Sequence, residues 1–362
     1  MAIHLHPFRN LFRLPERADP ALKAWVEGLG IRTPEPHPRA DQEEWTEAAA
    51  LAKAVIETGY EVVLHLTQPI RVFSMEENPD DIVRLPGASC PEILIRHGGG
   101  CLEGCAEPRD RVLSERYAEL AAFETLSGRR TVLTDCIISP DPESMSGYRD
   151  AMARSGAGLS IIDGMAEFRG RSCLVKVTRP VKHTHNRLFE VPADADARSL
   201  YSMVLGKYEF DLERISGDRD NVLIQEVIPM THETRFFVAG GEVVSGAGCI
   251  EEHTPLDREA GQGILPPVFE LGRNEGERVR DEGVAERLVA FAREAAAMIV
   301  AEEPELRNFV LDAAIGPDGA SVLIELNPIV GAGLYANDPV AIANALVEDM
   351  IRRAEPAMEP VP

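Results

Sequence analysis

The chain has 362 residues, which at about 150 residues per domain allows two or three domains, each able to bury its own core. Its 60 acidic residues outnumber 37 basic ones, and the net charge of -23 argues against binding to nucleic acid or to anionic membranes. The six scattered cysteines argue against a disulfide framework, and the absence of a long apolar run argues against a membrane span. We therefore expect a cytoplasmic protein.

The first third of the chain alternates between helix-like and strand-like patterns, which predicts an α/β layer with a largely parallel sheet. Glycines mark the expected helix ends. The expected elements are, in order, a helix over residues 42–58 ending at Gly59, strands over 61–66 and 91–96, a helix over 109–126 ending at Gly128, and a strand over 131–138.

From about residue 172 the pattern changes, and β-rich runs come in adjacent pairs. Gly240 and Gly241 separate two such runs and predict a tight hairpin. The long stretch 251–273 carries no clear element, so we expect a loop there that contacts substrate. The expected elements are strands over 172–178, 221–227, 234–238 and 242–245, helices over 195–205 and 277–301, and a final hairpin over 309–315 and 320–326.

The final hairpin separates its side chains onto two faces. If residues 316–319 form a four-residue turn, Ile315 faces Ala320 and one face of the hairpin is entirely apolar. The other face carries three oxygen-bearing side chains: Asp312, Glu325 and Asn327. Such donors suit Mg²⁺, although the same pattern also fits a hairpin with one side in solvent. The glycine-rich residues 328–335 favour a ligand site, because glycine lets backbone N–H groups approach a ligand.

This arrangement resembles the ATP-grasp enzymes, whose carboxyl-terminal lobe has an acidic residue on one strand and Glu-x-Asn on the next. The resemblance implies that Asp312, Glu325 and Asn327 hold Mg²⁺ between the phosphates of ATP, with Mn²⁺ as a substitute. Residues 222–229 and 233–238 are similar to the family's interlobe hinge and the strand after it. The hinge residues implied to contact adenine are Gln225, Glu226 and the backbone around Ile228.

The same resemblance implies further nucleotide contacts. Glu233 would bind the ribose hydroxyls, and Arg235 would reach the terminal phosphate or a developing acyl phosphate. The strand ending in Lys176 is similar to the one whose lysine contacts the inner phosphates, and Lys182 supplies a second cation from the loop that follows.

That loop departs from the family pattern, because it lacks the usual glycines. Side chains such as Arg179, Lys182 and His183 are expected to contact phosphate in place of backbone groups. Arg111 lies near the position of an earlier lysine of the family. Two plainer interpretations stay open: Lys176 as an edge-strand charge that prevents aggregation, and Glu226 with Arg235 as an ordinary cross-strand pair.

Two other groups of residues are weaker candidates for chemistry. Cys90, His97, Cys101 and Cys105 lie close in sequence, but their spacing is not that of paired zinc knuckles, and whether they bind metal is left open. His183 could act as an acid or base near the phosphates, or be an ordinary surface histidine.

The resemblance implies an ATP-grasp fold that is α/β, and α+β in its second half. Its parts would be an amino-terminal α/β domain over 1–108 and two lobes, over 109–224 and 225–362, that clasp ATP between antiparallel sheets. The implied activity is an ATP- and Mg²⁺-dependent, ADP-forming ligase that joins a small-molecule or peptide carboxylate to an amine. A small-molecule kinase and a non-catalytic nucleotide-binding scaffold are the alternatives. Homodimer formation is left open.

Overall fold

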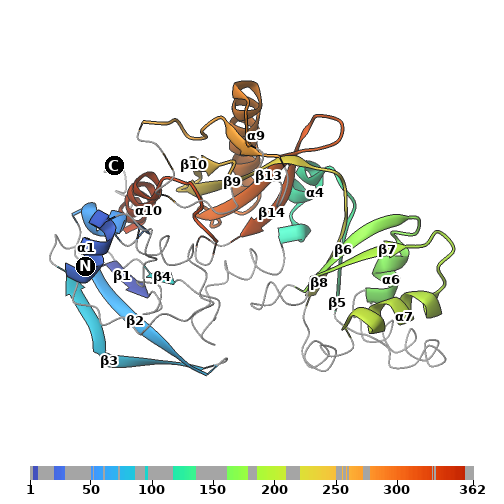
Figure 1. The fold of residues 1–362 in the computed structure, drawn as a ribbon, viewed down its shortest axis with the longest axis horizontal. Helices are drawn as coiled ribbons and strands as arrows, with labels where there is room; N and C mark the ends of the chain where they lie inside the picture. The colour runs from blue at the N-terminus through green and yellow to red at the C-terminus, as the bar shows by residue number, and fades with distance from the viewer. Residues whose placement is uncertain are drawn as a thin grey trace, which may run out of the picture. The chain divides into compact units, whose positions relative to one another are not determined.

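The computed structural model describes residues 3–6, 20–28, 50–51, 53–59, 62–71, 74–85, 94–96, 117–135, 161–177, 186–208, 221–249, 255, 258, 261–271, 278–327, 329 and 332–354. The chain divides into two compact units (Figure 1). Unit 1 contains Met1–Cys105, Thr231–Ile315 and Ile324–Pro362, and unit 2 contains Ala106–Met230 and Gly316–Leu323. The three-part division over 1–108, 109–224 and 225–362 stays a prediction.

The amino-terminal sheet of unit 1 has the strand order β3-β2-β1-β4. Its elements are β1 (Ile3–His6), β2 (Val62–Arg71), β3 (Ser74–Leu85) and β4 (Leu94–Arg96), with α1 (Pro20–Gly28) between β1 and β2. β1 is parallel to both β2 and β4, whereas β2 and β3 form an antiparallel hairpin. The sequence did not predict β3, because the segment is rich in Asp and Glu and contains Pro79.

A helix before β2 ends as its glycine predicts. Residues 53–57 are helical, and Gly59 has the left-handed φ of 86° that ends the helix. Val55 is buried in a core cluster that also contains Leu22 of α1. The part of the expected helix before residue 50 lies outside the described residues.

Unit 2 contains an antiparallel sheet with the order β5-β8-β6-β7. Its strands are β5 (Thr131–Asp135), β6 (Arg171–Val177), β7 (Arg187–Val191) and β8 (Asn221–Glu226), and its helices are η3 (Tyr117–Glu119), α4 (Ala121–Ser127), α6 (Ile161–Ala166) and α7 (Ala197–Tyr208). The placement of β5 in a parallel sheet was wrong, since β5 pairs antiparallel with β8. A strand's apolar pattern does not specify the direction of its partner.

One face of this sheet packs on helices α6 and α7, which lie on the same side of it (Figure 1). Val222 and Ile224 of β8 and Cys173 and Val175 of β6 point into this core, together with Leu200 of α7. Burial raises the pKa of the Cys173 thiol to about 11, so the thiol is neutral and behaves as a small apolar side chain.

The helix expected over 109–126 is shorter than its pattern. Leu120 is extended, with φ -68° and ψ 126°, and separates the 3₁₀ turn η3 from α4. Gly128 ends α4 in the left-handed conformation, with φ 59°, as predicted.

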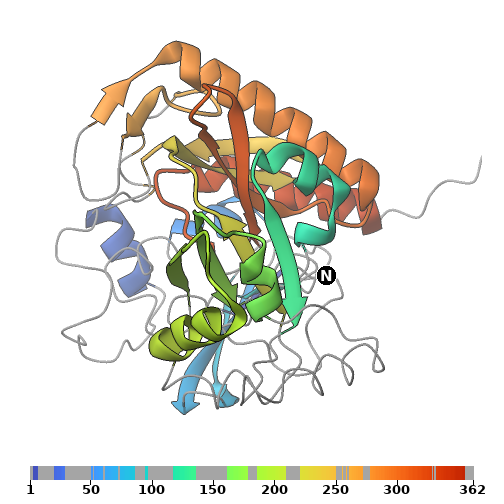
Figure 2. The same cartoon turned by 90° about the vertical axis from the view of Figure 1, so that its right-hand side faces the viewer.

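The second sheet of unit 1 is antiparallel with the order β10-β9-β13-β14. Its strands are β9 (Thr231–Ala239), β10 (Glu242–Ala247), β13 (Phe309–Ile315) and β14 (Ser321–Asn327), and its helices are α9 (Glu282–Glu302) and α10 (Pro339–Ala354). Figure 2 shows the long α9 running beside these strands, and α9 contacts β9, β10 and β13. Phe237 of β9 and Val310 of β13 pack in one core cluster with Ile342 and Val347 of α10.

The two hairpin turns of this sheet depend on glycine. Gly240 and Gly241 have φ values of 63° and 87° and form the predicted tight turn. The last hairpin is one residue tighter than predicted, because the N–H of Gly316, not of Ile315, donates to the Ala320 carbonyl at 2.8 Å. Gly319 makes this possible with a φ of 80°, which adds a bulge beside the turn.

The expected loop over 251–273 contains a short strand. β11 (Val268–Glu270) pairs antiparallel with β12 (Arg278–Arg280), a segment that the sequence assigned to the start of α9. The helix begins later because Asp281 caps it, its side chain accepting from the N–H of Val284 at 2.9 Å. Within the described ranges, no helix is both long and apolar enough to cross a membrane.

Candidate nucleotide and metal site

A cluster of charged and amide side chains lies on the second sheet of unit 1. Arg235 of β9 is directly paired with Asp312 of β13, and its Nε and Nη2 atoms donate to the two Asp312 oxygens at 2.8 and 2.7 Å. Asn327 of β14 donates through Nδ2 to Asp312 Oδ2 at 3.2 Å and to Glu325 Oε1 at 3.1 Å. The three residues predicted to hold metal therefore lie together, with Arg235 in contact.

The cluster is buried. Asp312 and Asn327 are each 3% exposed, and every residue of β13 is buried. The two residues thus do not cover a solvent-facing side of the hairpin, which was the alternative explanation for their pattern. By the two-residue period of β9, Arg235 is on the same face as Phe237, so the cluster continues an apolar core face.

Arg235 is held from two further directions. Its Nη1 donates to the carbonyl of Gly333 at 3.3 Å, and its guanidinium lies 4.7 Å from the centre of the Tyr335 ring. Burial alone would lower the pKa of Arg235, but the Asp312 carboxylate and its hydrogen bonds outweigh that effect and raise the pKa further. Tyr335 has a left-handed backbone, with φ 48°, which is costly for a residue of this size.

The donor chemistry of this cluster fits a magnesium ion. Asp312 and Glu325 supply carboxylate oxygens and Asn327 an amide oxygen, the hard ligands that Mg²⁺ prefers. Two of the carboxylate lone pairs on Asp312 are used by Arg235, which leaves others. Within the described part of the chain, no three His, Cys, Asp or Glu residues alone form a metal cluster, so Asn327 is needed to complete the set.

Glu233 lies next to an irregularity in β9. The pairing of β9 with β13 shifts between Ala313 and Ile315, and His232 beside Glu233 has a left-handed φ of 55°. Burial lowers the pKa of His232, opposed by Asp281, and its ring packs edge-on against Phe269 at 5.1 Å. A bulge re-aims the side chains next to it, so the direction of Glu233 depends on this local backbone.

The two hinge residues Gln225 and Glu226 are successive in β8 and therefore point to opposite faces of the unit 2 sheet. Glu226 accepts from Arg171 Nη1 at 2.6 Å. Because Glu226 pairs with Arg171 and Arg235 pairs with Asp312, each has an ion-pair partner other than the cross-strand one considered from the sequence. Ile228 is half-buried in the irregular segment after β8.

Gln225 is fully buried, yet among the described residues its amide oxygen and nitrogen have no hydrogen-bond partner. Its direct neighbour across the β5–β8 ladder is Thr131, whose hydroxyl is also buried and unpaired. Unpaired buried polar atoms are costly, and such groups often meet a ligand or water that completes them. Both residues lie on the face away from the core of Val222 and Ile224.

Lys176 lies in β6, an inner strand of the unit 2 sheet, opposite Leu223 of β8. The pairing of β6 with β7 ends at Val175, one residue earlier. Lys182, Arg179, His183, His185 and Arg111 lie outside the described residues, as do Cys90, His97, Cys101 and Cys105.

The sequence did not indicate Tyr335, Gly333 or Thr131 as individual site residues. The glycine-rich stretch 328–335 marked the neighbourhood of the first two, but only the fold shows which ring covers Arg235. Thr131 carries no sequence signal, because its pairing with Gln225 depends on the register of β5 and β8.

Arg258 is a further residue that the sequence did not single out. It lies in the expected substrate loop and donates to four backbone carbonyls: those of Gly246, Gly263, Ile264 and Ala336. Burial lowers the pKa of Arg258, opposed by the charge of Asp338. The loop is thereby fastened to the sheet by one side chain.

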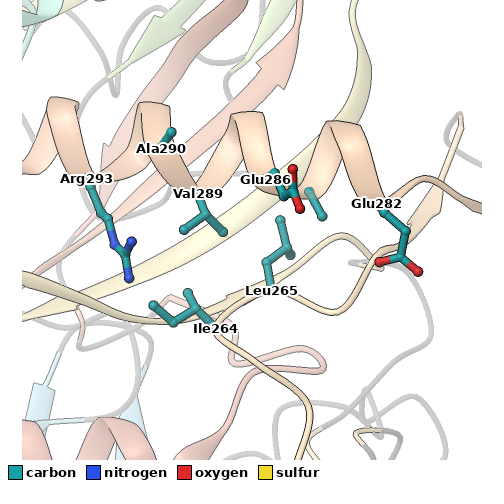
Figure 3. Close-up of a pocket in the computed structure, with 8 residues that line it drawn as sticks. Ile264, Leu265, Glu282, Glu286, Val289, Ala290 and Arg293 are labelled. Atoms are coloured by element: carbon teal, nitrogen blue, oxygen red, sulfur yellow. The ribbon is translucent and has the colours of Figure 1, made fainter.

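A shallow groove of about 480 Å³ lies elsewhere in unit 1, between α9 and the chain at Ile264 and Leu265 (Figure 3). Val289 and Ala290 of the helix line its apolar part, and its charged lining residues are Glu282, Glu286 and Arg293. None of these residues belongs to the predicted site.

Two antiparallel sheets, one bearing a hinge and one a buried acid–amide cluster, define the class of fold expected from the sequence. Residues 168–345 match the family model for an ATP-grasp domain, family 2 of its clade. This part of the chain is an ATP-grasp domain, and the predicted resemblance and fold class are confirmed. Comparison with curated proteins gave no match.

Solved structures with distant similarity include three of related size. D-cycloserine synthetase DcsG is 16% identical, with 97% of this chain and 100% of that chain covered and a TM-score of 0.44. Macrocyclase MdnC bound with precursor peptide MdnA, from Microcystis aeruginosa MRC, is 11% identical, with coverage of 98% and 100% and a TM-score of 0.45. D-alanyl-alanine synthetase A from Vibrio cholerae O1 biovar eltor str. N16961 is 9% identical, with coverage of 99% and 94% and a TM-score of 0.42.

Proposed function

We propose that the protein is an ATP- and Mg²⁺-dependent ligase. It would activate a carboxylate as an acyl phosphate, which an amine or similar nucleophile attacks, with release of ADP and phosphate. The observation that carries the proposal is the buried cluster of Arg235, Asp312, Glu325 and Asn327 inside the matched ATP-grasp domain.

Burial of these charges is poorly explained by stability. A buried ion pair returns little net stability, because desolvation of both charges offsets their attraction. The pair between Arg235 and Asp312 has side chains only 12% and 5% exposed, and an added carboxylate of Glu325 increases the negative charge beside it. Charged groups held in place away from water are what phosphoryl transfer requires.

The residues divide the work of the first step. Mg²⁺ bound with ATP would neutralise negative charge on the phosphates, and Asp312, Glu325 and Asn327 would hold it. Arg235 presents a planar, permanently charged donor fork that suits a phosphate or acyl phosphate, and Tyr335 and Gly333 fix its direction. The attacking carboxylate is already ionised at neutral pH, so this step needs no general base.

Gln225 and Lys176 would serve the nucleotide from unit 2. The unpaired amide of Gln225 offers both a donor and an acceptor, which matches the edge of a nucleobase. The family assignments for Lys176, Lys182, Glu226, Ile228 and Glu233 are carried in the same proposal, with ATP as the nucleotide. The substrates are proposed to be small-molecule or peptide carboxylates and amines, and the location the cytoplasm.

The test is a screen of amino acids, peptides and other carboxylates for stimulated release of ADP and phosphate, with products identified by mass. Alanine variants of Asp312, Glu325 and Asn327 should abolish the stimulated release. Glu294→Ala changes an exposed acid of α9 and is the matched control. Full Mg²⁺-dependent ADP release from all three site variants would contradict the metal assignment.

The same screen separates the alternatives. A stable phosphorylated product that forms without any amine would identify a kinase. Binding of ATP with no phosphate release in any substrate mixture would identify a non-catalytic nucleotide-binding protein.

A further inference from the structure

Arg235 uses the carboxylate that the proposed metal site needs. Its Nε and Nη2 take one Asp312 oxygen each, at 2.8 and 2.7 Å, in the parallel two-bond geometry that is strongest for this pair. Asn327 turns its NH₂ group, not its oxygen, toward Asp312 and Glu325, at 3.2 and 3.1 Å. The cluster in this form is arranged for a guanidinium cation and not for a metal.

A divalent cation entering this cluster alone would meet two obstacles. It would lie beside the fixed positive charge of Arg235, which is buried and therefore weakly screened by solvent. It would also require the Asn327 amide to turn its oxygen inward, and so to give up its two hydrogen bonds to the carboxylates. Both changes are unfavourable while Arg235 stays on Asp312.

A phosphate group removes the first obstacle, because it offers the guanidinium an anionic partner of the same forked geometry. Arg235 is also prevented from leaving for solvent. The Tyr335 ring covers its guanidinium at 4.7 Å, and the Gly333 carbonyl accepts from Nη1 at 3.3 Å. The arginine can thus exchange partners within the site without being released from it.

We propose that Arg235 is the resident cation of the metal site and makes binding of a divalent metal depend on nucleotide. This inference rests on the proposed function. In the nucleotide-free protein, Arg235 occupies Asp312 and metal binds weakly. When a nucleotide supplies phosphate, Arg235 shares or leaves Asp312, and the carboxylates with the Asn327 oxygen become available to metal.

The experiment measures Mn²⁺ affinity by electron paramagnetic resonance, with and without a non-hydrolysable ATP analogue. The variant Arg235→Met removes the resident cation and keeps an apolar chain of similar reach. Its matched control is Arg307→Met, which removes an arginine from another carboxylate pair of unit 1, Arg307 with Asp349 at 3.1 Å. Thermal unfolding with added MnCl₂ alone gives a second readout that does not require turnover.

For the unaltered protein we expect Mn²⁺ to bind about tenfold more tightly with the analogue than without it, within the usual range of coupling between two ligands. Arg235→Met should raise the nucleotide-free Mn²⁺ affinity about tenfold and largely remove the dependence on the analogue. MnCl₂ alone should then raise the unfolding temperature of Arg235→Met, but not of the unaltered protein or Arg307→Met. If Arg235→Met does not fold, Arg235→Lys, which keeps the charge without the fork, should show a smaller rise in nucleotide-free affinity.

The outcomes distinguish this inference from the proposed function. If the unaltered protein binds Mn²⁺ equally well with and without the analogue, the inference is overturned and the metal site stands. The same holds if the Arg235 variants bind nucleotide-free Mn²⁺ no better than Arg307→Met. If no Mn²⁺ binds even with the analogue, the proposed metal site itself is wrong.

Discussion

The polar groups on the sheet of β9, β13 and β14 differ from those on the sheet of β5 and β8. On the first sheet, the guanidinium of Arg235, the carboxylate of Asp312 and the amide of Asn327 are joined by hydrogen bonds of 2.7 to 3.2 Å. On the second, the amide of Gln225 and the hydroxyl of Thr131 lie side by side in the ladder and, within the described residues, lack partners.

The difference indicates two ways of preparing a buried surface for a ligand. Charges are so costly to leave alone in an apolar interior that the protein pairs them with each other, and a ligand must exchange for an existing partner. A neutral amide or hydroxyl costs less when unpaired, and it can wait for a ligand to complete it. Ligand binding at the first surface is therefore a substitution, and at the second an addition.

A second arginine–carboxylate pair in unit 1 provides the reference for the first surface. Arg307 contacts Asp349 and also donates to the Gly240 carbonyl at 2.8 Å, while Asn308 links Asp349 to the N–H of Gly240. These groups connect α10 to the turn between β9 and β10. They illustrate a charged pair that has a structural role.

The largest expected effect separates these two arginines. Arg235→Lys should lower the turnover of ATP to ADP by about 10²–10³-fold, because lysine lacks the donor fork aimed at developing charge. Arg307→Lys should keep the turnover of the folded protein and lose roughly 1–2 kcal/mol in free energy of unfolding, through its lost hydrogen bonds. Steady-state kinetics and urea unfolding of both variants measure the two quantities. Equal losses of turnover would show that the two pairs do not differ in role.

A smaller effect is expected at the second surface. Gln225→Met removes the two unpaired polar atoms at nearly constant volume, so the free energy of unfolding should stay constant or rise by about 1 kcal/mol. Affinity for the ATP analogue should fall about 5- to 10-fold, the value of one or two hydrogen bonds. Calorimetry and chemical unfolding measure both changes.

The control for Gln225→Met is Thr134→Val, in β5. Thr134 is 3% exposed and has interaction partners, so its replacement should lower stability and leave nucleotide affinity unchanged. A marked loss of stability in Gln225→Met would mean that its amide is paired within the protein.

The smallest effect concerns the opposite, helix-covered face of the same sheet. Cys173 is buried there, and its pKa rises from 9.0 to about 11 on folding. A raised pKa means that folding favours the neutral thiol, so this contribution is full below pH 9 and is lost as pH rises toward 11. Unfolding free energy should fall roughly 2 kcal/mol more between pH 9 and 11 than in Cys173→Ala. Identical pH profiles would show that this face is open to water.

Much of the fold could be predicted from local patterns. Glycines placed the ends of two helices and the turn at Gly240 and Gly241 correctly, because a left-handed backbone strongly favours glycine. The period-two pattern of the last hairpin correctly placed Asp312 with Glu325 and Asn327. The strands β3 and β7 and the helix α6 were not predicted, since their short or polar sequences have no clear period.

What could not be predicted depends on contacts distant in sequence. The pairing of β5 with β8, of Arg235 with Asp312 and of Tyr335 with Arg235 join segments that only tertiary packing brings together. The shift of α9 to Glu282 had a local cause, the cap at Asp281, but a helical period alone does not show where the first turn begins. Roles of individual site residues stay predictions for the experiments above.

Arg258 has a consequence for the order in which the molecule assembles. Its hydrogen bonds reach Gly263 nearby in the chain, Gly246 at a separation of 12 residues and Ala336 at a separation of 78. Closing so long a loop costs chain entropy that local contacts do not, so the contact with Ala336 forms only after the surrounding sheet has assembled. The segment that Arg258 fastens thus becomes ordered late in folding and is among the first parts of unit 1 to open.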